Sequence, residues 1–134
     1  MMDRNVMRKR TRDFAVRVIR LVAALPAGRV GDVLGRQILK SGTSIGANYR
    51  EAIRTSSRRH FVTTLEIAQR ESDETLYWLD LIAESGLVKA GRLKKPQQAC
   101  DELLSIVAAT VKSTKQRRVG AKSEIRNPKS EIAQ

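Results

Sequence analysis

The sequence predicts an all-α protein, folded as an antiparallel up-down four-helix bundle, from three observations. Its 134 residues are enough for one domain with a buried core, and 41% of them are hydrophobic. Aromatic residues make up only 4%, and the aliphatic, alanine-rich and charged remainder favours helices over strands. Apolar residues recur at helical spacing in four segments separated by short breaks. Amphipathic helices with short connections pack as an antiparallel bundle.

The first helix is predicted over about residues 12–25. One side collects five apolar residues at helical spacing: Phe14, Val18, Leu21, Val22 and Leu25. The opposite side carries three charged residues: Lys9, Asp13 and Arg20. Residues 1–11 precede this helix and are predicted to form a basic N-terminal extension. Pro26 and Gly28 supply the turn that ends the helix.

The second helix, predicted over about residues 30–54, carries three distinct surfaces. Its apolar stripe contains Leu34, Ile38, Ser41, Ile45, Tyr49 and Ala52. A glycine seam beside the stripe contains Gly31, Gly35, Gly42 and Gly46. We interpret the seam as a close-packing surface, because a phosphate-binding loop needs a preceding strand and usually a Lys-Ser or Lys-Thr ending. A separate basic face contains Arg36, Lys40, Arg50 and Arg54.

The third helix is predicted over about residues 57–85, with Ser56 or Ser57 as its N-cap and Gly86 as its C-terminal cap. Its main stripe contains Phe61, Leu65, Ala68, Ser72, Thr75, Leu79 and Ile82. A second face contains Ile67, Glu71, Trp78 and Leu81, beside His60 and Glu74. Because a lone bundle needs one stripe per helix, this face and the seam residues Gly42 and Gly46 are predicted to lie at a subunit interface. The alternative is a wide core-facing arc with Trp78 at its rim.

The fourth helix is predicted over about residues 91–116, and Pro96 near its start is tolerable in a first turn. Its apolar stripe contains Leu93, Cys100, Leu103, Val107, Val111 and Thr114. Residues 12–117 therefore form the bundle domain.

From residue 118 the chain is polar, repeats the tetrapeptide KSEI and lacks an apolar stripe. Residues 118–134 are predicted to be a disordered basic tail.

The charge distribution favours a polyanionic partner. The chain carries a formal net charge of +12, although residues 71–88 hold five acidic residues and no basic one. Such a balance favours association with nucleic acid or with a membrane surface, and the alternative is a soluble protein with a lysine-rich surface. We expect nucleic acid, RNA or DNA, to be contacted through phosphates by six residues: Arg36, Lys40, Arg50, Arg54, Lys9 and Arg20.

Catalysis and metal binding find little support in the sequence. Glu71 and Glu74 resemble the carboxylates of di-iron bundles, but those sites need Glu-x-x-His motifs on two helices and His60 is the single histidine. Cys100 lies on an apolar stripe, which predicts a buried, inert thiol. We expect no enzyme activity, metal, cofactor or small-molecule substrate. A single cysteine and the lack of a membrane-length apolar run predict a cytoplasmic protein without membrane contact.

Two stretches, GTSIGANYREA and FVTTLEIAQRESDETLYWLDLIAESGLV, together resemble the four-helix bundle family of 23S rRNA intervening-sequence proteins. The family pattern matches residues 44–48, Glu51 and residues 74–79, and the DFAVRVIRLVAALP opening extends the resemblance over residues 12–115. Gly46 replaces the proline that is common in one branch of the family. The resemblance implies a bacterial, non-enzymatic homopentamer. In a related branch, the accessory variability proteins of diversity-generating retroelements, basic pentamers bind nucleic acid and a reverse transcriptase.

Two functions remain open at this point. The first is a non-enzymatic module that binds the phosphate backbone of RNA or DNA with low sequence specificity. The second is a structural or adaptor protein whose ligand is another protein, such as a reverse transcriptase. Strong salt dependence of polynucleotide binding favours the first, whereas salt-insensitive capture of one protein favours the second.

Overall fold

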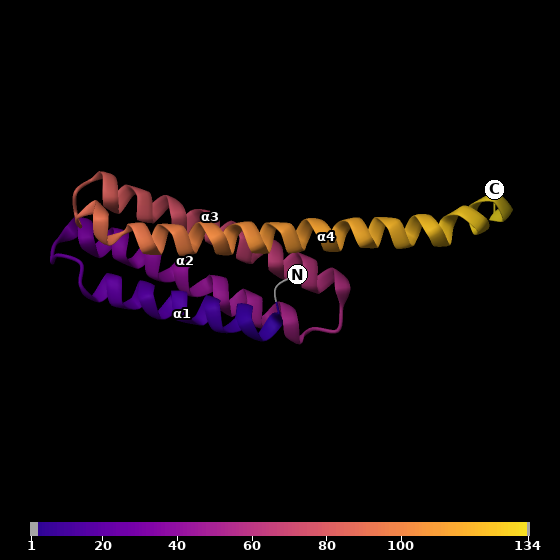
Figure 1. Ribbon diagram of the computed structural model, residues 1–134, viewed down its shortest axis with the longest axis horizontal. Helices are drawn as coiled ribbons and strands as arrows, with labels where there is room; N and C mark the ends of the chain where they lie inside the picture. Colours follow the sequence, from indigo (N-terminus) through magenta and orange to yellow (C-terminus); the bar gives the residue numbers. More distant parts are fainter. Residues whose placement is uncertain (1–2, 134) are drawn as a thin grey trace.

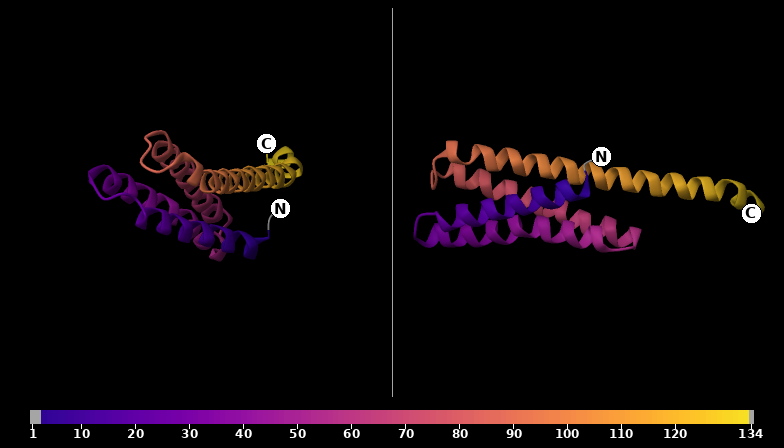
Figure 2. Two further views of the ribbon diagram at one scale, coloured as in Figure 1. Left: turned by 60° about the vertical axis from the view of Figure 1, so that its left-hand side comes forward. Right: turned by 60° about the horizontal axis from the view of Figure 1, so that its bottom comes forward.

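The computed structural model describes the backbone of residues 3–133 and the side chains of residues 3–117. Within this range the chain forms four α-helices and one short 3-10 helix, without strands: α1 (Arg4–Ala23), α2 (Arg29–Arg54), α3 (Arg58–Glu84), η1 (Ala90–Arg92) and α4 (Lys94–Ala133). Successive helices run in alternating directions, and α4 continues well past the ends of the other three (Figures 1 and 2). The predicted all-helical, four-helix class is confirmed.

The four helices pack in chain order, with unequal contact. The pair α2–α3 is the most extensive, α1 packs on α2, and α4 packs on α3. By contrast, α1 and α4 meet only along a shallow seam, which the Arg10–Glu102 ion pair bridges at 2.7 Å. Helix α1 therefore lies diagonally across from α3. One groove runs between α1 and α2, and another lies between α1 and α4.

The predicted apolar stripes meet in one core. Its fully buried members include Ile38, Ile45, Leu65, Leu79, Ile82 and Leu103. Two stripe residues with hydroxyl groups, Ser41 on α2 and Thr75 on α3, hydrogen-bond to each other at 2.9 Å inside this core. Their pairing explains how the stripe accommodates polar residues, because buried hydroxyls are tolerated when they are hydrogen-bonded.

Helix α1 begins earlier in the chain than the sequence predicted. The Asp3 side chain caps the helix by accepting hydrogen bonds from the backbone N–H groups of Asn5 and Val6 at 2.7 and 3.3 Å. Met7 and Thr11 then extend the buried stripe backward, at 2% and 1% exposure. Residues 4–11 are therefore part of the bundle, and the prediction of an N-terminal extension over residues 1–11 is corrected for them. Residues 1–2 lie outside the described residues.

The glycine seam of α2 packs against α1 of the same chain. A Cβ added to Gly42 would lie 2.9 Å from Val18, and one added to Gly46 would lie 3.3 Å from Thr11. The close-packing interpretation is thus confirmed. The placement of Gly42 at a subunit interface is corrected, because Gly42 is buried against α1 of the same chain. Gly46 is half-buried and borders the open side of the α1–α2 junction, so its placement at a subunit interface stays a prediction.

The ends of α3 follow the predicted capping chemistry. The Ser57 hydroxyl accepts a hydrogen bond from the His60 N–H at 3.1 Å, which makes Ser57 the N-cap. After the helix, Gly86 has a φ of +75°, a left-handed conformation that glycine adopts at little cost.

Helix α4 starts at Lys94, so that Pro96 falls in its first turn, and its backbone remains helical to Ala133. The sequence predicted a disordered tail from residue 118. Apart from Gly120 and Pro128, this segment is composed largely of residues that helices tolerate well, and the lack of an apolar stripe did not forbid helix. Its side chains and residue 134 lie outside the described residues, so the predicted boundary of the packed domain at residue 117 stays a prediction.

Within the described part of the chain, no helix combines the length and the apolar character needed to cross a membrane.

Candidate nucleic-acid interface

A basic groove of about 710 Å³ runs along the outer junction of α1 and α2; we call it the α1–α2 groove. Its cationic lining consists of Arg8, Lys9, Arg12, Arg50 and Arg54. The rest of its lining is small or polar: Asn5, Thr11, Ala15, Thr43, Gly46 and Ala47. Among these described lining residues there is no Asp or Glu. The groove is therefore a concave surface whose charged lining residues are all positive.

Helix geometry explains why these side chains converge. Arg8 and Arg12 are four residues apart on α1, and Arg50 and Arg54 are four apart on α2, so each pair lies on one helix face. The two helices are antiparallel, which places the start of α1 beside the end of α2. Arg54 in the last turn of α2 also lies at the negative end of the helix dipole, where a cation is stabilised.

The six predicted contact residues do not form one face. Arg50, Arg54 and Lys9 line the α1–α2 groove. Arg36 lies toward the other end of α2, where it lines a separate pocket of about 350 Å³ together with Asp32.

The remaining two predicted residues face other helices. Lys40 lies near Glu71 of α3, where its charge offsets a small part of the rise that burial causes in the pKa of that carboxyl group. Arg20 lies on the other side of α1, toward α4. The four residues of the predicted basic face on α2 therefore lie in different surroundings along the helix.

Arg8 and Arg12 line the groove but were not singled out from the sequence. Their spacing of four residues was the available signal. That spacing has structural meaning only because α1 begins at Arg4, which places Arg8 and Arg12 in one continuous helix.

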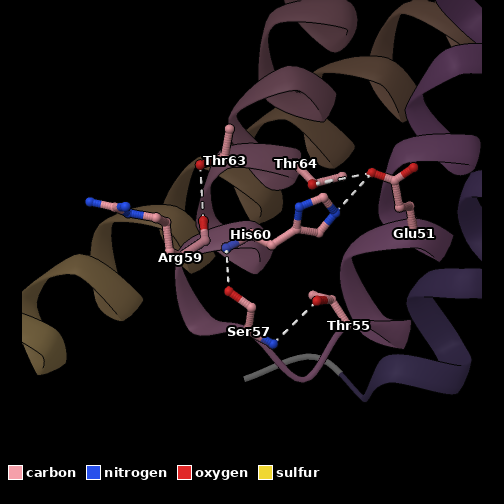
Figure 3. A network of polar contacts seen from close by, with 7 residues as sticks. All are labelled: Glu51, Thr55, Ser57, Arg59, His60, Thr63 and Thr64. Atoms are coloured by element: carbon pink, nitrogen blue, oxygen red, sulfur yellow. Dashed lines mark hydrogen bonds and ion pairs between the residues drawn. The ribbon is translucent and has the colours of Figure 1, made fainter.

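The carboxylate nearest in sequence to the groove arginines, Glu51, is engaged by α3. Figure 3 shows the side chains of His60 and Thr64 directed at the Glu51 carboxylate; His60 Nε2 lies 3.1 Å and Thr64 Oγ1 3.4 Å from Oε2. Among the side chains that the structure describes, Arg50 and Arg54 form no ion pair with Glu51 or any other acid. Their positive charges are available to a ligand.

One cation of the groove does have an acidic partner. Lys9 Nζ lies 2.8 Å from Asp13 Oδ2, one turn along α1, and both side chains are well exposed. Exposed pairs of this kind contribute only about 0.3–0.5 kcal/mol on a helix surface. The pair is weak enough for a phosphate to compete for Lys9.

A second basic groove, of about 320 Å³, lies between α1 and α4; we call it the α1–α4 groove. Its cations are Arg17, Arg20, Arg92 and Lys95. Its other lining residues are apolar: Leu21, Ala24, Val88 and Pro96. The sequence pointed to Arg20 alone; Arg17 lies one turn away on the same helix, and Arg92 and Lys95 come from η1 and α4.

The outer face of α3 is half-buried at Ile67, Glu71, Trp78 and Leu81. Trp78 packs against the core from its rim, and its ring meets that of Tyr77 edge-on at 5.2 Å. The Trp78 indole N–H is buried and has no hydrogen-bond acceptor among the described residues. Burial, followed by the charge of Glu74, raises the pKa of the Glu71 carboxyl group. This face therefore offers apolar surface, whereas the unsatisfied indole N–H lies beneath it and is not accessible from outside.

Within the described residues, no three His, Cys, Asp or Glu side chains cluster as metal ligands do. Cys100 is buried, with Sγ 3.2 Å from the Ser72 carbonyl oxygen. Burial raises the pKa of this thiol to about 12. The thiol is therefore protonated at neutral pH, unlike a nucleophilic cysteine.

Comparisons with known proteins place this fold in a family. The profile of the 23S rRNA-intervening sequence protein family matches residues 3–109. A crystal structure from Bacteroides thetaiotaomicron, described as a protein with unknown function from the S23 ribosomal protein family, is 35% identical with a TM-score of 0.77. The match covers 83% of this chain and 99% of that one. No curated protein matches the chain significantly. The chain belongs to the 23S rRNA-intervening sequence protein family.

Proposed function

We propose that the protein binds RNA or DNA through the phosphate backbone, with low sequence specificity and without catalysing a reaction. The observation that carries this proposal is the α1–α2 groove, in which five cationic side chains converge without an acidic lining residue. Four of the five are arginines, whose planar guanidinium groups match phosphate oxygens in a bidentate geometry. A basic patch on one face is the electrostatic footprint of a nucleic-acid-binding protein.

Low sequence specificity follows from the groove's chemistry. Apart from the cations, its lining offers mainly short side chains, with Asn5 as its single amide. Reading base edges requires side chains that enter a groove of the nucleic acid, whereas cations on phosphates position the ligand without reading it. We therefore expect similar affinities for unrelated sequences of equal length.

Titrating a labelled oligonucleotide at several salt concentrations tests this function. Each phosphate contact that is neutralised contributes about 0.9 to the slope of log affinity against log salt for duplex DNA, and about 0.7 for single strands. The double variant Arg50→Gln/Arg54→Gln removes two contacts, so its binding weakens and its slope flattens. The matched control Arg59→Gln/Arg70→Gln removes the same charge from exposed positions on α3. Absence of binding at low salt, or equal effects of both variants, contradicts the proposal.

We propose further that the bundle forms a homo-oligomer, for which the family resemblance favours a pentamer, in the bacterial cytoplasm. The outer face of α3 supports this assembly. A neighbouring subunit packed on the half-buried Ile67 and Leu81 would bury apolar surface that one chain leaves in water.

The same face favours a second candidate function, in which the protein is an adaptor for another protein such as a reverse transcriptase. Tyr77 is 57% exposed beside the half-buried Trp78, and these two residue types are enriched at protein interfaces. Salt-insensitive binding of a protein partner, lost in Tyr77→Ala but retained in Arg50→Gln/Arg54→Gln, identifies this alternative.

A further inference from the structure

The α1–α4 groove repeats the chemistry of the α1–α2 groove at a different place. Arg17 and Arg20 come from α1, Arg92 from η1 and Lys95 from the first turn of α4. All four residues are exposed, and they form no ion pair with any acid among the side chains described. Its described lining residues again include no Asp or Glu. A cluster of unneutralised cations in a concave surface is suited to bind phosphate groups.

The two grooves lie on opposite sides of α1. Arg8 lines the first groove and Arg17 lines the second. Nine residues separate them, which corresponds to about half a turn around the helix and about 14 Å along its axis. The body of α1, about 10 Å across, therefore stands between the two clusters.

The surface of α1 between the grooves carries side chains of mixed character, including the exposed cations Lys9 and Arg20. Val16 falls midway between Arg8 and Arg17 on the helix and is 39% exposed. The Asp13 carboxylate, also exposed, is a negative charge on the same outer side. One strand that occupied both grooves would have to bend around the outer side of α1, past Val16 and the Lys9–Asp13 pair. Two separate strands avoid this bend.

We infer that the α1–α4 groove is a second phosphate-binding site, so that each chain holds two nucleic-acid segments, one on either side of α1. This inference rests on the proposed function. Each groove is short: the α1 part of the first groove, from Asn5 to Ala15, is about 15 Å long, which corresponds to about four nucleotides of one strand. The chain would thereby bring two segments of one molecule, or two molecules, together.

The number of short strands bound per protein chain tests the inference. The probe is a single-stranded oligonucleotide of about four nucleotides, or about 14 Å at about 3.4 Å per nucleotide. It matches one groove and is shorter than the path of about 20 Å between the two clusters around α1. Sedimentation of the full chain with saturating probe at low salt measures the ratio. Because strands are counted per chain, the result does not depend on the oligomeric state. We expect two strands per chain.

Matched double variants assign the two strands to the two grooves. Arg17→Gln/Arg20→Gln and Arg50→Gln/Arg54→Gln each remove two charges, and each should bind one strand per chain. Arg59→Gln/Arg70→Gln, with the same loss of charge on α3, should still bind two. Circular dichroism melting confirms that each variant is folded, as expected for exposed residues.

The contrary outcomes separate the two proposals. One strand per chain in the wild type, or two in Arg17→Gln/Arg20→Gln, overturns the second site and leaves the proposed function in place. Absence of any binding by the wild type overturns both.

Discussion

Gly42 faces Val18 so closely that a Cβ at position 42 would lie 2.9 Å from both methyl carbons of the valine. Val18 is 1% exposed, and its branched side chain has little freedom to rotate away. The absence of a side chain at Gly42 thus sets how near α1 approaches α2. The α1–α2 groove depends on this approach, because its cations come from both helices.

Gly42→Ala should therefore destabilise the protein although alanine is the better helix former. Overpacking costs about 1–3 kcal/mol, and alanine recovers about 1 kcal/mol of helix propensity, so we expect a net loss of about 1 kcal/mol. Gly46→Ala is the matched control, because its Cβ would meet Thr11 at a more tolerable 3.3 Å. Urea unfolding should show Gly46→Ala to be the more stable variant. Equal stabilities would mean that α1 shifts freely.

The hydrogen bond between Ser41 and Thr75 should appear as coupling between two substitutions. Ser41→Ala or Thr75→Val alone removes one partner and should cost about 1 kcal/mol of unfolding free energy. The double variant should cost less than the sum, because neither hydroxyl then lacks its partner in the core. Additive losses in a double-mutant cycle would show that the contact contributes nothing.

The raised pKa of Cys100 predicts a loss of stability in alkali. The unfolded thiol ionises near its ordinary value of 9.0, whereas the folded thiol keeps its proton up to about pH 12. The unfolded state then binds fewer protons in this window, so the unfolding free energy decreases as pH rises, by up to about 1.4 kcal/mol per pH unit. Below pH 9 this contribution is fully present.

Cys100→Ser provides the comparison, because a serine hydroxyl does not ionise in this range and can still donate to the Ser72 carbonyl group. Urea unfolding between about pH 8 and pH 10 should show a smaller decrease for this variant than for the wild type, by about 1.4 kcal/mol. Parallel decreases would indicate that the thiol is ionised equally in both states.

The proposed assembly predicts a mass well above the 15.0 kDa of one chain in light scattering. Ile67→Lys/Leu81→Lys should lower that mass, because two buried charges at an interface are strongly unfavourable. Val6→Lys/Val30→Lys adds the same charge at positions that are 45% and 58% exposed and should leave the mass unchanged. A monomeric wild type at micromolar concentration is incompatible with the assembly.

The sequence by itself determined the helices and their buried faces. Hydrophobic periodicity is a property of residues close together in the sequence. The stripe containing Ile38, Ser41 and Ile45 could therefore be predicted without knowing which helix packs against it. Turn chemistry is equally local, as Ser57 and Gly86 show at the two ends of α3.

Only the tertiary structure decided which faces meet. Periodicity states that Gly42 lies on a packing face, but not that the partner is α1 of the same chain. Periodicity likewise could not predict that Arg8 lies near Arg54, or Arg20 near Lys95. Each pair lines one groove because segments distant in the sequence pack side by side. The physical reason is that a helical repeat fixes the direction of a side chain around its own axis, whereas a site requires the relative placement of several axes.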